Sequence, residues 1–145
     1  MKRPHGDDGT ILLLVLGFAA LLLVLVAIVA DISTVILARR GAASAADGAA
    51  IAAAQQLDQE AVYAHGIDTA IPLSPEGVQQ VVSTYGAQAA TAQKGLQLTA
   101  DLDRAQTTAT VVATRKVTLP FVGWLGVGSV TVTAVAHAKA PLVTP

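Results

Sequence analysis

The chain has 145 residues and a formal net charge of −1, which leaves room for one membrane segment and one small domain of about 80 to 100 residues. From Arg39 onward seven basic residues balance seven acidic ones, so the sequence lacks the basic surface that a nucleic-acid-binding protein needs. Cysteine is absent, which excludes disulfides, thiol catalysis and thiolate metal ligands.

Residues 1–9 form a short polar leader, and an uninterrupted apolar run follows from Ile11 to Ala30. In a helix, twenty residues cover about 30 Å, which is the thickness of the bilayer hydrocarbon core. The run predicts a membrane anchor and helix extension over 10–38, an extracytoplasmic domain over 39–140 and a tail over 141–145. A cleaved signal peptide is the alternative, although its apolar region is usually only about 7 to 15 residues long.

Asp31 stands at the end of the apolar run. A carboxylate at this depth is costly in lipid and usually faces water or a partner. Two interpretations follow from the sequence. Asp31 lies at the wet membrane interface, or it lies within a helix bundle and pairs with a basic group of a neighbouring subunit.

The apolar run is expected to continue as one long alanine-rich helix from Thr10 to His65, because no proline interrupts it and alanine has the highest helix propensity. A break near Gly41 or after Gln56 is the alternative. Small residues recur every fourth position and would let another element approach closely. The stripe consists of Gly41, Ala45, Ala49 and Ala53. The helix packs here on the chain's own sheet, on a helix of another subunit, or on both through opposite faces.

The remaining sequence predicts one short helix followed by three strands. Ser74-Pro75-Glu76 is a helix start, with serine as the N-cap, proline at the first helical position and glutamate in the first turn. From Leu96 apolar residues alternate with polar ones through three threonine-rich segments that end near Lys139. Such alternation is typical of antiparallel strands with one packed face. The predicted class is therefore α+β, with a sheet of about three strands.

The segment between the second and third predicted strands contains two of the five aromatic residues of the chain. It either covers the core of the sheet or presents an apolar tip to a membrane or a partner. The candidate tip consists of Phe121, Trp124 and Leu125.

Residues with catalytic or ligand-binding chemistry form no recognisable site. His5, His65 and His137 are far apart and lack metal-ligand spacing, and the glycines from Gly123 to Gly128 lack the lysine and hydroxyl residue of a phosphate loop. We therefore expect a protein that is not an enzyme, with no catalytic residue, no metal and no cofactor, and with no nucleic acid as partner.

Residues 9–57 resemble the Flp pilus-assembly TadE/TadG-like family. The resemblance rests on a leader that ends in glycine, an apolar helix with an aspartate soon after it, Ala38-Arg39-Arg40, and the Ala-Ala-Asp-x-Ala-Ala-x-Ala-Ala-Ala signature at 45–54, which includes Asp47. The alternating end at 117–140 is also similar to members of this family. The glutamate that accompanies prepilin processing at the fifth mature position is replaced by Leu14, so the resemblance does not extend to that feature.

The resemblance implies a non-catalytic, minor pilin-like component of tight-adherence pili or of secretion. It would be anchored once in the bacterial cytoplasmic membrane, with the N-terminus inside and the C-terminal domain outside. Its expected partners are the lipid bilayer, other pilin-like or Tad assembly proteins, and further copies of the chain in a homo-oligomer. The alternative function is a membrane-tethered binding module of the cell envelope that is unrelated to pili.

Overall fold

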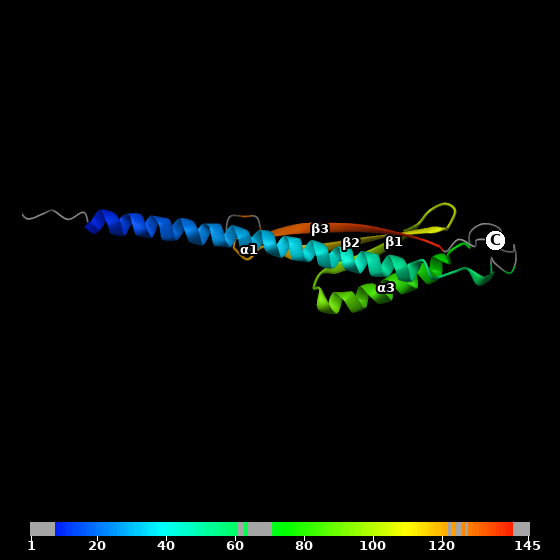
Figure 1. Cartoon of the computed structure of the whole chain (residues 1–145). Helices are drawn as coiled ribbons and strands as arrows, with labels where there is room; N and C mark the ends of the chain where they lie inside the picture. Colours follow the sequence, from blue (N-terminus) through cyan, green and yellow to red (C-terminus); the bar gives the residue numbers. More distant parts are fainter. Residues whose placement is uncertain are drawn as a thin grey trace, which may run out of the picture.

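A computed structural model describes residues 8–60, 63, 71–121, 123, 126 and 128–140. Its first element is helix α1 (Asp8–Ala53), which is unbroken through Gly41 and about 69 Å long at 1.5 Å per residue. The N-terminal half of α1 extends beyond the rest of the molecule, whereas the C-terminal half lies against the sheet and the second helix (Figure 1).

Helix α1 ends at Ala53, about three turns before the predicted end at His65. The physical reason is a competing set of backbone hydrogen bonds beyond Gln55. The Gln56 carbonyl accepts from the Ser74 N–H, and Leu57 forms an isolated antiparallel bridge with Leu73. The break expected as the alternative after Gln56 is therefore close to the observed end, while His65 lies outside the described residues.

Helix α3 (Pro75–Ala92) begins where its cap was predicted. The Ser74 side chain accepts a hydrogen bond from the Gly77 N–H at 3.3 Å, and Pro75 occupies the first turn, where a missing N–H costs nothing. Val78 and Val82 are fully buried on its inner side. The prediction of a short helix that begins at Ser74-Pro75-Glu76 is thus confirmed.

Three strands form one antiparallel sheet in the order β1 (Leu96–Leu102), β2 (Thr108–Thr118) and β3 (Ser129–Lys139). Val111 of β2 pairs with Ala100 of β1 and with Ala136 of β3, so the apolar positions of all three strands share one face. The predicted α+β class and the three-stranded meander are confirmed.

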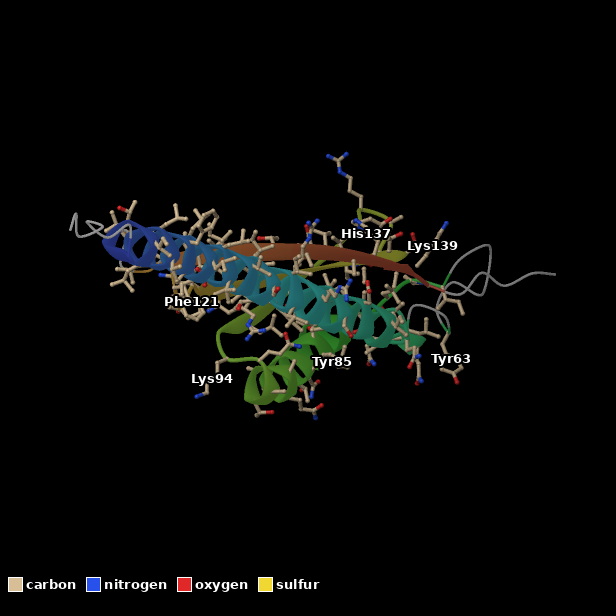
Figure 2. All side chains as sticks on the ribbon, turned by 60° about the vertical axis from the view of Figure 1, so that its left-hand side comes forward. Tyr63, Tyr85, Lys94, Phe121, His137 and Lys139 are labelled. Carbon is tan, nitrogen blue, oxygen red and sulfur yellow. The ribbon has the colours of Figure 1, made fainter. Side chains whose placement is uncertain are left out.

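Both helices cover the same face of the sheet. Helix α1 lies over β2 and β3, and α3 lies beside it against β1 (Figure 1). The core between these two layers is made largely of alanine and valine, with Leu73 and Leu96 as its larger members. Because alanine is short, the helix backbone lies close to the strands. The opposite face of the sheet carries threonines, His137 and Lys139 (Figure 2).

Candidate assembly surface of helix α1

Most of the predicted stripe of small residues lies on the inner face of α1, toward the sheet. Ala49 and Ala53 are fully buried in the core of this chain, and Ala45 is 5% exposed. This arrangement corresponds to packing on the chain's own domain, which was one of the interpretations of the stripe. We therefore revise the prediction for these three alanines, since their burial leaves no surface for a helix of another subunit.

Two glycines of α1 lie under α3 and the residue that follows it. A Cβ atom added at Gly48 would lie 2.8 Å from Cζ of Tyr85, and one added at Gly41 would lie 2.6 Å from Oε1 of Gln93. The absence of side chains at these positions therefore lets α3 approach α1 closely. Gly41, predicted as an assembly residue, is in contact within the chain.

Gln93 connects three elements through its side-chain amide. Its Nε2 donates to the Gly41 carbonyl of α1 at 3.2 Å, and its Oε1 accepts from Nη1 of Arg115 in β2 at 3.5 Å. Arg115 interrupts the apolar face of its strand, and this interaction gives it a polar neighbour within the fold. Gln93 was not singled out from the sequence as a contact residue, although the glycines at 41 and 48 were a usable signal for a close approach.

Asp31 is 5% exposed, and its carboxylate contacts the connection between β2 and β3. The backbone N–H of Phe121 donates to Oδ1 of Asp31 at 3.2 Å, across 90 positions of the sequence. Neither sequence interpretation included this contact, because both assumed a solvent or a subunit partner. Within the fold, Asp31 holds the end of the sheet against the helix.

The outward face of the C-terminal half of α1 is accessible. An exposed stripe with helical spacing runs along it and ends in the turn after the helix. We call it the outer stripe, and it consists of Leu37, Arg40, Ser44, Asp47 and Ile51 of α1 and Gln55 of the turn. Leu37 is 66% exposed and Ile51 is 59% exposed. Among the predicted assembly residues, Asp47 is the one that the structure places on this surface.

The predicted interaction tip is described in part. Phe121 is 49% exposed and lies beside α1 at the end of the sheet (Figure 2). Trp124 and Leu125 lie outside the described residues. Next to Phe121, an apolar groove of about 320 Å³ is lined by Ile28, Asp31, Ile32, Val35, Ile36 and Leu119.

The titratable groups show no arrangement typical of an active site in the part of the chain that the structure describes. That part contains no cluster of three histidine, aspartate or glutamate side chains suited to a metal ion. His137 is close to the Thr110 hydroxyl, with 2.9 Å between Nδ1 and Oγ1, across strands β2 and β3. The pKa of Asp103 is lowered because its carboxylate accepts hydrogen bonds. The bond from the Thr108 N–H has the largest effect, followed by those from the Thr107 N–H and hydroxyl. These bonds hold the turn between β1 and β2.

The long helix is also the segment that a known family model matches. It is long and apolar enough to cross a membrane, and no residue of its most apolar stretch is buried within the chain. No curated protein and no solved structure matches the chain. A family model described as "Putative Flp pilus-assembly TadE/G-like" matches residues 9–56, which are α1 and the turn that follows it. Over this third of the chain, the resemblance to the Flp pilus-assembly TadE/G-like family is confirmed.

Proposed function

We propose that this protein is a membrane-anchored, non-catalytic, minor pilin-like component of Flp pilus assembly. The observation that carries the proposal is the division of α1 into two parts. Its first half exposes leucine, valine and isoleucine on all sides, while its second half is the scaffold of the folded domain. A helix of a soluble core would be buried, whereas a helix in lipid has apolar residues all round.

The same division supports one membrane passage at 10–38, with the domain at 39–140 on the outer side. The resemblance to the family supports this orientation. The basic residues do not decide it, because Lys2 and Arg3 before the run balance Arg39 and Arg40 after it. The absence of cysteine makes a clean test available. Ser129→Cys, at an exposed position of β3, should react with a membrane-impermeant maleimide in intact cells, whereas Thr10→Cys should react only after lysis.

The outer stripe is the surface that we propose for assembly with other pilin-like subunits or with further copies of the chain. It belongs to the segment that the family model matches, and the chain's own domain leaves it uncovered. Arg40 and Asp47 are seven residues apart, which is about 10.5 Å along the axis. Two parallel copies displaced by this distance would bring these opposite charges together.

Charge reversal on the outer stripe tests this function. Asp47→Arg should reduce recovery of other pilus-assembly proteins after crosslinking in cells, because it places a like charge against the proposed cation of the partner. Asp101→Arg is the matched control, since Asp101 is also exposed but lies on the sheet. Recovery that is equal for Asp47→Arg and the wild type would contradict the proposed surface. Full membrane retention with no association to pilus proteins would favour the envelope binding module.

A further inference from the structure

The apolar surface of α1 continues past Asp31. Ile32 is 54% exposed, Ile36 is 47% exposed and Leu37 is 66% exposed, values similar to those of the apolar run before Asp31. From Ile11 to Leu37 the helix covers about 40 Å, which exceeds the hydrocarbon core of about 30 Å and approaches the full bilayer thickness of about 40 to 45 Å. The exposed apolar surface therefore continues beyond Ala30, where the uninterrupted apolar run ends.

The polar side chains within this extension have hydrogen-bond partners inside the protein. The Ser33 hydroxyl donates to the Val29 carbonyl at 2.8 Å, and the Thr34 hydroxyl donates to the Ala30 carbonyl at 2.9 Å. Asp31 accepts from the Phe121 N–H and is almost fully buried. Hydroxyl groups that are satisfied in this way can lie in apolar surroundings at low cost, whereas the Asp31 carboxylate is kept from lipid by its burial within the protein.

The connection between β2 and β3 contacts α1 near Asp31. Leu119 is buried beside Ile28, Ile32 and Ile36, which line the apolar groove together with Asp31 and Val35. Phe121 remains half exposed on the same side of the molecule as the apolar helix, whereas Tyr63 lies at the opposite end of the domain (Figure 2). Phenylalanine and leucine side chains are typical of the apolar face of protein segments that lie at the boundary between headgroups and acyl chains.

We infer that Ile28, Ile32, Ile36 and Phe121 form a membrane-edge patch that lies in the interfacial region of a phospholipid bilayer. In this arrangement the anchor extends to Leu37, and Asp31 holds the end of the sheet at the lipid boundary. Continuity with the anchor helix identifies lipid as the occupant of this patch. The inference rests on the proposed membrane anchor and goes beyond it, because an anchor alone would leave the domain in water.

Single-tryptophan variants of the full chain provide the test. Trp124 is the sole tryptophan, so Trp124→Phe creates a background in which one reporter is introduced by Phe121→Trp, Phe18→Trp or Tyr63→Trp. Each variant is reconstituted into phosphatidylcholine vesicles whose acyl chains carry bromine near the headgroup end. Bromine quenches tryptophan only at short range, so loss of emission reports contact with this part of the lipid.

The inference predicts that the reporter at position 121 loses more than about a third of its emission, as expected for an interfacial aromatic residue, while the reporter at position 63 is unchanged. Asp31→Ala should weaken the quenching at position 121, whereas Asp31→Asn, which keeps an acceptor oxygen, should preserve it. Quenching at position 18 without quenching at position 121 would overturn the membrane-edge patch and leave the anchor intact. No quenching at position 18 would overturn the anchor, and equal quenching at positions 63 and 121 would overturn the specific patch.

Discussion

The contact between Gly48 and Tyr85 gives a sharp test of how α1 and α3 pack. Gly48→Ala places a methyl group against the Tyr85 hydroxyl and the ring carbon that carries it, with 2.8 Å between the added carbon and Cζ. Gly86→Ala is the matched control, because Gly86 also lies in a helix of the same domain. There, an added carbon would meet Leu98 at 3.5 Å or more, which is an ordinary van der Waals distance.

Both substitutions raise helix propensity, but only Gly48→Ala overpacks a tight contact. Replacing a glycine inside a helix by alanine contributes about 0.5 to 1 kcal/mol to stability. Overpacking a tight contact costs about 1 to 3 kcal/mol, because the ring and the helix must move apart. Gly86→Ala should therefore stabilise the domain by about 0.5 kcal/mol or more, whereas Gly48→Ala should destabilise it by about 1 kcal/mol.

Thermal unfolding of the full chain in detergent micelles, followed by near-ultraviolet circular dichroism, measures this difference. The aromatic signal reports the folded domain, whereas the far-ultraviolet signal would be dominated by the membrane helix. For a domain of this size, a difference of about 1.5 kcal/mol corresponds to about 6 to 12 °C in Tm. A Gly48→Ala protein that unfolds at the same temperature as Gly86→Ala, or above it, would show that the Tyr85 side chain is not held against Gly48.

Three further predictions follow from contacts that position α1 and the turns. Asp31→Ala should lower the free energy of unfolding by about 1 to 3 kcal/mol, because the Phe121 N–H loses its acceptor. Asp31→Asn keeps an acceptor oxygen and should lower the free energy of unfolding by less. Urea unfolding of the two variants measures this difference. Asp103 has a lowered pKa, so its carboxylate stabilises the fold above the unfolded-state pKa, and this contribution is lost as pH falls below about 4. Asp103→Asn should therefore show a smaller loss of Tm between pH 5 and pH 3 than the wild type, by about a few degrees at most for an exposed group; equal losses would contradict the role assigned to the turn. Gln93→Ala should speed hydrogen exchange at the C-terminal end of α3, since it removes the contacts to Gly41 and Arg115, and unchanged exchange would show that these contacts are dispensable.

The start of α3 and the three strands could be predicted from the sequence, because neighbouring residues determine them. The Ser74-Pro75-Glu76 start and the alternation along each strand correspond directly to capping and to the two faces of the sheet. The end of α1 was predicted too late, because its alanines and glutamines favour a helix, whereas the pairing of Gln56 and Leu57 with Leu73 and Ser74 ends it. A helix boundary set by tertiary pairing carries no local signal.

The contacts of the candidate assembly surface on α1 were harder to predict, because they too depend on residues distant in the sequence. Small residues on α1 indicate a close neighbour but do not say which one, and the chain's own sheet and α3 occupy most of that stripe. The partner of Asp31 is a backbone amide 90 residues away, and a backbone group has no identity in the sequence. Asp47 is different, since its polar side chain within an alanine-rich segment already marks an outward position.

The unbroken course of α1 from its apolar half into the domain makes the molecule a rigid arm. Asp31 and Ala53 are separated by about 33 Å of continuous helix, and the domain is attached along this length at Asp31, Gly41 and Gly48. Membrane helices tilt by about 20° on average, and such a tilt would displace the far end of the arm sideways by about 11 Å. Bilayer thickness would thereby control where the distal end of the domain meets its neighbours, with no change of conformation.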